Sequence, residues 1–360
     1  MAKKIRVGII GIGNCFAGLI QGIEYYKKHK DKKPIGLMHL KIGPYDFKNI
    51  EFVSAFDVGE NKIGKALNKA IFASPNLVKW TKPPKSKVVV KESPVLDGVG
   101  IYVENKIKPL KNPTPIEKLK KEIEKEIKKT KTEVLVNYLP VGSQKATEFW
   151  AEMALLAKTA FVNCLPAFIA SDKKWAEKFK KAKVPIIGDD IKGQIGATII
   201  HRVLARLCDD RGATIDKTYQ INVGGNSDFL NMLERSRLES KKISKTEAVT
   251  SQINKGIKSD KIYIGPSDFI PFLGNTKLAF IRLEGKMFAD IPYSVELRLE
   301  VDDKANSAGV VIDAIRCAKL AQDRKMGGYL NVSSYFMKRP LVQVSDEEAK
   351  EIVEEFIAGK

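Results

Sequence analysis

A short apolar segment near the start of the chain, IRVGII at residues 5–10, leads directly into a glycine-rich turn, GIGNCFAG, and then into a helical pattern. This order of strand, glycine turn and helix opens a dinucleotide-binding unit, because glycines let the backbone approach a pyrophosphate at the N-terminus of the helix. Gly11 and Gly13 fit the first two glycines of the G-x-G-x-x-G pattern, whereas Phe16 occupies the third position. We therefore expect a Rossmann-like parallel sheet, with Gly18 serving for close packing of the helix.

A second predicted strand, residues 51–56, ends at Asp57. An acid at this place usually holds the adenosine ribose of the cofactor, and it disfavours the 2′-phosphate of NADP by charge repulsion. The distance from Gly13 exceeds the usual spacing of about 20 residues, so residues 27–49 are expected to form an ordered insertion. The alternative for Asp57 is a turn former before Val58. With the glycine turn upstream, we favour the ribose contact and NAD as the cofactor.

Short apolar runs and helices continue through the first half of the chain. The runs do not alternate, as in parallel strands covered on both faces, and lie at residues 87–90, 133–138, 160–163 and 184–187. The clearest helix spans residues 116–129, and Thr114 and Glu117 predict a capping box at its start. Its expected buried stripe consists of Ile116, Leu119, Ile123 and Ile127, and its expected outer ion pairs are Glu117–Lys121 and Glu124–Lys128.

The pattern changes after Gly196. A helix is predicted over residues 197–208, and the strand YSVELRLEV at 293–301 then alternates strictly, which is typical of an antiparallel sheet with one apolar face. Residues 218–223, 261–264 and 278–283 can join this sheet, and residues 306–324 resume as a helix. We expect a doubly wound α/β domain from residues 1–196 plus 305–360, with an inserted α+β catalytic and oligomerisation domain at 197–304.

Composition narrows the class of protein. The chain has 360 residues, is 44% hydrophobic and carries a formal charge of +19. This charge is spread along the chain and mixed with glutamate, so it does not favour a nucleic-acid partner, and lysine- and glutamate-rich surfaces also occur in proteins from hot environments. The three histidines show no metal-ligand spacing, and the four cysteines form no CxxC pair. No apolar run has the length of a membrane span and no signal peptide is apparent, so we expect a cytoplasmic protein without a metal or a membrane partner.

Polar groups concentrate in five segments: GDDIKGQ (188–194), GGNSDFLNMLE (224–234), ESKKISK (239–245), VDDKANSAG (301–309) and SSYFMKRP (333–340). A backbone that turns on Gly224 and Gly225 can direct several N–H groups at a phosphate. Lysines crowded in one pocket depress each other's pKa and can then carry protons near neutral pH. Each segment has a plainer interpretation as a turn, a cap or a solvated charge. Their combination with a dinucleotide-binding opening favours a catalytic site.

These segments resemble the inositol-3-phosphate synthase family, also named myo-inositol-1-phosphate synthases, in its shorter prokaryotic and archaeal form. The matching motifs span nearly the whole chain and include VGIIGIGNC, GLMHLKIGPY, VPIIGDDIKGQIGAT, NVGGNSDFLNMLERSRLESKKISKT, EVDDKANSAGVVIDA and SSYFMKRP. The resemblance implies an isomerase of inositol and phospholipid biosynthesis that converts D-glucose 6-phosphate to 1D-myo-inositol 3-phosphate. The implied steps are oxidation of C5 by tightly held NAD, loss of a C6 proton, aldol closure on C1, and reduction of C5. It also implies a homotetramer.

The resemblance further implies roles for individual residues. Lys241 is the candidate for proton exchange at the C5 oxygen, and Lys338 and Lys277 are candidates for stabilising the carbonyl and enolate oxygens. Asp228 and Asp303 would orient the lysines. The substrate phosphate would contact Lys245, Ser227 and Asn231, and the cofactor would contact Gly11, Gly13, Asn14, Cys15, Asp57, Asp190 and Lys192.

Two residues depart from the family pattern. Many relatives have serine where this chain has Gly193, and Phe16 replaces a smaller residue, which is expected to alter packing over the pyrophosphate. The alternative function is a sugar-phosphate dehydrogenase with net turnover of NAD. A basic binding protein with a relic nucleotide site is a weaker alternative, because it leaves the lysines without a role.

Overall fold

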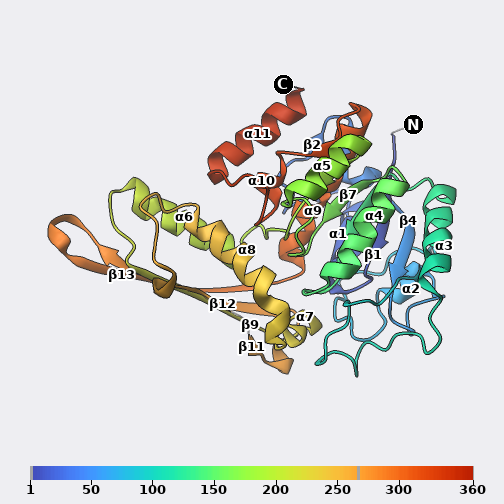
Figure 1. Ribbon diagram of the computed structural model, residues 1–360, viewed down its shortest axis with the longest axis horizontal. Helices are drawn as coiled ribbons and strands as arrows, with labels where there is room; N and C mark the ends of the chain where they lie inside the picture. Colours follow the sequence, from blue (N-terminus) through green and yellow to red (C-terminus); the bar gives the residue numbers. More distant parts are fainter. Residues whose placement is uncertain (1–2, 266–267, 360) are drawn as a thin grey trace.

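The computed structural model describes residues 3–265 and 268–359, and Figure 1 shows a larger part built on a parallel sheet and a thinner, elongated part built on a second sheet. The larger sheet has seven strands in the order β14-β8-β7-β6-β1-β4-β5, all parallel. Its strands are β1 (Ile5–Ile10), β4 (Ile50–Asp57), β5 (Lys91–Glu92), β6 (Val134–Asn137), β7 (Ala160–Asn163), β8 (Pro185–Ile187) and β14 (Gly328–Tyr329). The strand order reverses at β1, and ligands bind at such a switch point beyond the carboxyl ends of the strands. The predicted α/β Rossmann-like fold is therefore confirmed.

Helices cover both faces of this sheet. Two separate apolar cores result: one joins α1 and α9 to the sheet, and the other joins α3, α4 and α5 to it. The helices of this part are α1 (Asn14–Lys28), α2 (Leu67–Ala70), α3 (Ile116–Lys129), α4 (Gln144–Leu156), α5 (Lys173–Ala182), α9 (Ala305–Asp323), α10 (Ser333–Phe336) and α11 (Asp346–Ala358). After the smaller sheet is complete, α9 packs against β6, β7 and β8 of the parallel sheet, and β14 pairs with β8.

The smaller part contains a five-stranded sheet in the order β10-β9-β12-β13, with β11 also paired to β9. Its elements are α6 (Ala197–Asp210), β9 (Lys217–Gly224), α7 (Ser227–Asn231), α8 (Glu239–Thr250), β10 (Ile262–Ile264), β11 (Asp268–Phe269), β12 (Thr276–Lys286) and β13 (Pro292–Asp302). Strands β9, β12 and β13 are antiparallel, but β10 and β11 run parallel to β9, so the expectation of a purely antiparallel sheet was wrong. Helices α6 and α8 cover one face (Figure 1). We infer domain boundaries at 1–196 plus 305–360 and at 197–304.

The insertion between α1 and β4 is ordered. It contains the hairpin strands β2 (Lys41–Ile42) and β3 (Tyr45–Asp46), followed by the 3-10 turn η1 (Phe47–Asn49). Further 3-10 turns are η2 (Arg235–Leu238), η3 (Ser259–Lys261), η4 (Pro271–Leu273) and η5 (Phe288–Asp290). The buried Arg316 of α9 donates to three carbonyl oxygens of the insertion, those of His39, Leu40 and Tyr45. Tertiary hydrogen bonds thus fix a segment that has little secondary structure of its own.

Several local predictions around α3 were wrong. Glu92 accepts hydrogen bonds from both the backbone and the hydroxyl of Thr114, at 2.9 and 2.7 Å, so this hydroxyl does not cap the helix. Ile116 is 38% exposed, and Glu117 pairs with Lys120 and not with Lys121. The run at 87–90 is not a regular strand, because the short strand β5 begins only at Lys91. The edge of the sheet at β5 is therefore shorter than the apolar pattern suggested.

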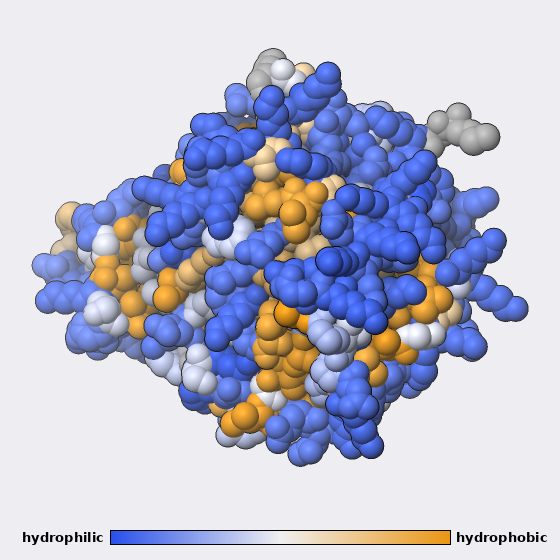
Figure 2. Space-filling view, turned by 45° about the vertical axis from the view of Figure 1, so that its right-hand side comes forward, coloured by the Kyte–Doolittle hydropathy of each residue, from blue (hydrophilic) through white to orange (hydrophobic). Residues whose placement is uncertain are grey.

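The surface is consistent with the high lysine content. On the face shown in Figure 2, hydrophilic residues cover most of the molecule and apolar residues form separate groups between them. Within residues 3–265 and 268–359, no helix is both long and apolar enough to cross a membrane.

Candidate active site

The glycine turn lies at the carboxyl end of β1 and lines a cavity that also contacts the smaller part. Gly11 has a φ of 86°, and a Cβ atom there would lie 2.8 Å from the carbonyl oxygen of Tyr138, so only glycine fits. A Cβ atom at Gly13 would meet nothing within 4 Å. Gly18 approaches Trp80 and Lys304 closely, with 3.1 and 3.3 Å to a built Cβ, which supports its expected packing role.

The N-terminus of α1 opens on this cavity without a side-chain cap, because its N-cap residue is Gly13. Asn14 accepts a hydrogen bond from the backbone of Leu77 at 2.6 Å, while its buried Nδ2 atom has no partner among the described residues. Burial raises the pKa of the Cys15 thiol beside it. Phe16 is fully buried and packs edge-to-face on Phe52.

Asp57 is buried at the end of β4 and lines the same cavity. Its carboxylate accepts the backbone N–H groups of Ile12 and Gly59 at 2.6 and 2.8 Å, and the ammonium of Lys62 lies 3.5 Å away. The side chain therefore braces the glycine turn and shapes the turn after β4. The turn-forming interpretation of Asp57 has direct geometric support, and its place in the lining also leaves it within the pocket that a ribose would enter.

Lysines from three separate elements face the glycine turn across the cavity. Lys241 and Lys245 come from α8, Lys277 from β12, and Lys338 from the segment after α10. Several buried cations around one cavity carry a large desolvation free energy unless acidic side chains balance their charge. Besides Asp57 at the glycine turn, the acids that line the same cavity are Asp190, Asp228 and Asp303. The structure thus brings together residues that are up to 148 positions apart in the chain.

Asp190 and Lys338 form the closest pair of this group. The ammonium of Lys338 donates to Oδ1 of Asp190 at 2.8 Å and to the carbonyl oxygen of Ile191 at 2.5 Å. Ser244 of α8 donates to the other carboxylate oxygen at 2.8 Å. Asp190 itself adopts a φ of 62°, an uncommon conformation for a residue with a side chain, and such conformations cluster at functional sites.

Asp303 holds two cations at the opposite side of the cluster. Lys277 lies 3.3 Å from one of its carboxylate oxygens and Lys304 lies 2.8 Å from the other. Lys304 is 2% exposed and also lines the cavity. Burial alone would raise the pKa of Asp303, but Lys304 and Lys277 hold it below the ordinary range. Asp303 is therefore a carboxylate that fixes two lysines.

The environment divides the lysines into two kinds. Burial lowers the pKa of Lys338, although Asp190 opposes this, and burial together with Lys277 and Lys241 lowers the pKa of Lys245 well below the ordinary value. Burial also acts on Lys241 and Lys304, but neighbouring carboxylates outweigh it and raise the pKa of both. Mutual depression of the pKa therefore holds for Lys338 and Lys245 and not for Lys241.

The turn before α7 provides polar groups beside Lys245. Asn226 caps α7, since its Oδ1 atom accepts the backbone N–H of Asp228 at 3.0 Å. Asn231 donates to the carbonyl oxygen of Val141 at 3.0 Å, which directs its side chain, and its buried Oδ1 has no partner among the described residues. Ser227 lines the same cavity. These groups lie where an anionic end of a ligand can meet the lysines.

Comparisons with known proteins identify the family and the fold of this chain. The family model described as myo-inositol-1-phosphate synthase matches residues 196–304. An inositol-3-phosphate synthase from Mycolicibacterium smegmatis is 50% identical over 99% of this chain and 99% of its own. One from Mycobacterium tuberculosis is 51% identical over 99% of this chain and 97% of its own. The chain belongs to the inositol-3-phosphate synthase family. A myo-inositol-1-phosphate synthase-related protein from Thermotoga maritima, 23% identical over 99% of this chain and 98% of its own, has the same fold with a TM-score of 0.81.

One expected cofactor contact of the family pattern is not supported. Lys192 is turned away from the cavity, and its buried ammonium donates to the carbonyl oxygen of Ser334 at 2.8 Å and to Asp346 at 3.2 Å. Burial lowers its pKa to about 8. The side chain takes this direction because residues 189–192 pair with residues 336–339, which leaves Lys192 facing the C-terminal segment.

One residue that lines the cavity, Lys304, was not foreseen. Lys304 lies inside the segment VDDKANSAG, next to Asp303, but a single lysine at the start of a helix usually lies in solvent. Its adjacency to a predicted site acid was the only available signal. Gly193, which departs from the family pattern, is closely packed in this structure. A Cβ atom there would lie 3.0 Å from the side-chain amide of Asn306. A serine at this position requires Asn306 to move.

Proposed function

We propose that the protein converts D-glucose 6-phosphate to 1D-myo-inositol 3-phosphate, an isomerisation with no net consumption of cofactor. The observation that carries this proposal is one cavity lined by both the glycine turn and the lysines Lys241, Lys245, Lys277, Lys304 and Lys338. Oxidation, enolisation and aldol closure all develop negative charge on oxygen, and fixed positive charges in a closed site stabilise such charge. The family membership supports the same reaction.

The residues at the glycine turn fit NAD. The uncapped N-terminus of α1 and the free Nδ2 of Asn14 offer N–H donors that suit a diphosphate. Gly11, Gly13 and Asn14 would hold the diphosphate, Cys15 would pack beside it, and Asp57 would contact the adenosine ribose while still bracing the turn. Asp190 would lie near the nicotinamide. When bound, NAD supplies redox chemistry at C5 that no side chain of the chain can supply.

Lys338 and Asp190 are the pair we assign to proton exchange at the C5 oxygen. The pKa of Lys338 is lowered, so this side chain carries the proton. Burial would raise the pKa of Asp190, but Lys338 and Lys241 outweigh burial and lower this pKa, so Asp190 stays a carboxylate and orients the ammonium of Lys338 through their 2.8 Å hydrogen bond. This replaces Lys241 in the role that the family resemblance implied. Lys241 keeps its proton because carboxylates raise its pKa, and we assign it to charge stabilisation.

The remaining cations act as fixed charges. Lys277 and Lys304, both held by Asp303, would face the carbonyl and enolate oxygens. Asp228 would balance Lys241 and Lys304, whose pKa values it helps to raise. Lys245, Ser227 and Asn231 would bind the substrate phosphate. The dianion would offset the strong desolvation of Lys245 and stabilise its charged form.

We also propose that the smaller domain forms the contacts of a homotetramer. The face of its sheet away from α6 and α8 exposes Tyr219, Ile221 and Phe280, which are neighbours across β9 and β12. A second copy of the chain can cover these side chains. Light scattering at micromolar concentration tests the tetramer, and a monomer contradicts it.

We also propose a cytoplasmic location for the protein. Its four cysteines are free, as is usual for proteins in a reducing compartment.

The main alternative is a dehydrogenase of a phosphorylated sugar, which shares the cofactor domain. The two functions differ in their demand for NAD. Purified protein with glucose 6-phosphate and a catalytic amount of NAD should yield inositol phosphate over many turnovers, detected by 31P NMR, without accumulation of NADH. Stoichiometric NADH without a cyclised product would contradict the proposal and favour the dehydrogenase. The Lys338→Ala protein, prepared in the same way, controls for contaminating enzymes.

A further inference from the structure

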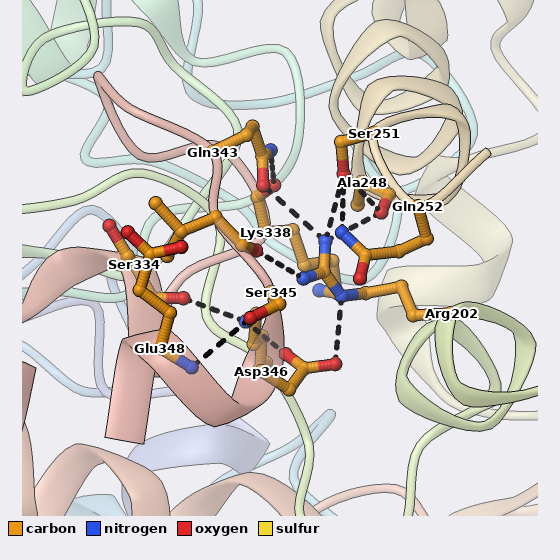
Figure 3. Close-up of polar contacts among 12 residues, drawn as sticks. Arg202, Ala248, Ser251, Gln252, Ser334, Lys338, Gln343, Ser345, Asp346 and Glu348 are labelled. Atoms are coloured by element: carbon orange, nitrogen blue, oxygen red, sulfur yellow. Dashed lines mark hydrogen bonds and ion pairs between the residues drawn. The ribbon is translucent and has the colours of Figure 1, made fainter. Parts of the chain in front are cut away.

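Arg202 of α6 is a fully buried arginine that does not line the cavity. Its guanidinium makes five hydrogen bonds to segments that are far away in the sequence. They go to Oδ2 of Asp346 at 3.1 Å, the carbonyl of Ala248 at 2.6 Å, Oγ of Ser251 at 3.2 Å, Oε1 of Gln343 at 3.4 Å and the carbonyl of Val344 at 2.9 Å. Figure 3 shows these partners converging on the guanidinium from both sides.

The first group of partners lies at the C-terminal end of α8. Ala248 is one turn after Lys245, and Ser251 follows the last residue of the helix. The N-terminal end of the same helix carries Lys241. Ser244, in the middle of the helix, donates a hydrogen bond to the carboxylate of Asp190. A guanidinium that holds Ala248 and Ser251 therefore fixes the position and rotation of the helix that carries the two lysines.

The second group of partners lies directly after Lys338. Gln343 accepts from Arg202 and donates its own Nε2 to the carbonyl oxygen of Lys338 at 2.7 Å. Val344 accepts at the neighbouring position. The loop that carries Lys338 is thus closed by Gln343 and held by the guanidinium.

The third connection runs through Asp346 at the start of α11. Its two carboxylate oxygens bind Arg202 and Lys192, and Lys192 directly follows Asp190 and Ile191. The backbone of residues 189–192 in turn pairs with that of residues 336–339. The three segments that position Asp190, Lys338 and the lysines of α8 thus meet at the ion pair between Arg202 and Asp346.

We propose that Arg202 is a positioning residue that keeps helix α8 and the Lys338 loop in register with Asp190. Arginine suits this role because its planar fork presents five N–H donors in fixed directions, which a lysine cannot reproduce. The inference extends the proposed function, since it concerns the same site, but the geometry that carries it lies outside the cavity.

The test compares Arg202→Lys with Arg316→Lys. Arg316 is a matched control, because it is equally buried, also binds carbonyl oxygens and one carboxylate, and fixes the insertion at residues 39–45 instead of the lysines. We expect Arg202→Lys to bind NAD like the wild type and to lose kcat on the order of 10²-fold, the usual consequence of a displacement of about 1 Å in a catalytic group. KM for glucose 6-phosphate should change much less. Arg316→Lys should retain kcat even where its thermal midpoint falls as far.

A second readout does not require activity. The pKa of Lys338 can be measured from the pH dependence of its acylation, followed by peptide mass spectrometry. In Arg202→Lys the loop relaxes toward solvent, so this pKa should rise toward the ordinary value of about 10.4, while in Arg316→Lys it should not change. The charged and titratable groups facing Lys338 are Asp190, Cys164, Lys192, Lys241, Lys245 and Lys277.

The outcomes are distinguishable. If Arg202→Lys and Arg316→Lys lose kcat equally, or if the pKa of Lys338 is the same in wild type and Arg202→Lys, then Arg202 is only structural and the inference is wrong. If the wild type makes no inositol phosphate, the proposed function fails, and the acylation readout still decides the inference. If Arg202→Lys does not fold, Gln343→Ala can replace it. This variant removes the side chain that joins Arg202 to the carbonyl oxygen of Lys338 and leaves the other partners of Arg202 in place, and it should also raise the pKa of Lys338.

Discussion

Lys338 and Asp190 form a hydrogen-bonded ion pair at 2.8 Å, and Lys338 also donates its backbone N–H to the carbonyl oxygen of Asp190 at 2.7 Å. A side-chain contact and a backbone contact together fix the ammonium relative to the carboxylate. The two residues reach this arrangement from opposite ends of the second half of the chain. The pair is the place where we expect the chemistry of this protein to be most sensitive to substitution.

The first prediction concerns the two lysines beside Asp190. Lys338→Ala and Lys241→Ala should each lose cyclisation by about 10²–10³ or more, the usual effect of removing one preorganised electrostatic contact. Both should retain NAD, because neither lysine supports the glycine turn. Turnover and isothermal titration with NAD measure the two properties. Lys121→Ala, on the exposed side of α3, is the control and should behave like the wild type.

The second prediction concerns Lys245. Lys245→Ala should raise KM for glucose 6-phosphate more than it lowers kcat, because the phosphate is present in both the ground state and the transition state. Steady-state kinetics at saturating NAD separate the two parameters. A large loss of kcat with unchanged KM would assign Lys245 to the chemical steps instead.

The third prediction concerns Lys304. Lys304→Met preserves most of the side-chain volume but leaves Asp303 with Lys277 as its remaining cation among the described residues. We expect kcat to fall by about 10²-fold, because a fixed positive charge at the cavity is lost. Lys304 packs against Gly18 of α1, so NAD affinity and the thermal midpoint are measured in parallel. Wild-type kcat in this variant would show that Lys304 only balances Asp303.

The fourth prediction concerns the choice of cofactor. The carboxylate of Asp57 should repel a 2′-phosphate, so NAD should bind more tightly than NADP. Isothermal titration with each nucleotide measures the two affinities. Equal or tighter binding of NADP would mean that Asp57 only braces the turn through Ile12 and Gly59.

The fifth prediction concerns stability and pH. A hydrogen bond to Asp313 at 2.5 Å raises the pKa of His39. A raised pKa in the folded state stabilises the protein fully below the unfolded value of about 6.5 and is lost as pH rises through the folded value. The free energy of unfolding lost in His39→Gln should therefore be larger at about pH 6 than at about pH 9. Chemical denaturation at several pH values measures it.

The pKa of His201 is shifted in the opposite direction to that of His39, so its effect on stability changes with pH in the opposite sense. Burial lowers its pKa to about 4, so the unfolded state binds more protons between about 4 and the ordinary value of about 6.5. Its contribution makes stability rise with pH in that window, and His201→Gln should flatten this slope. Equal pH dependence for the two variants would contradict both assignments.

Much of the architecture could be read from neighbouring residues in the chain. The segment IRVGII and its glycine turn predicted β1 and α1, and the alternation in YSVELRLEV predicted β13. The predicted glycine turn after residue 10 is present, and Gly11 has a φ of 86° there. These features depend on periodicity and backbone sterics, which are properties of adjacent residues.

The directions of individual side chains were decided only by the tertiary structure. Lys192 follows Asp190 by two positions, yet it faces Asp346 and not the cavity, because the backbone there pairs with residues 336–339. Lys304 is buried beside Asp303, and Arg202 gathers partners 46 to 144 positions away. Burial and ion pairing depend on which distant segments the fold brings together, and these determine the charge of a lysine as much as its identity does. The sequence by itself therefore determined the order of the strands and helices and the kinds of side chain available to the site, and the tertiary structure decided which lysines face the cavity and which carboxylates hold them.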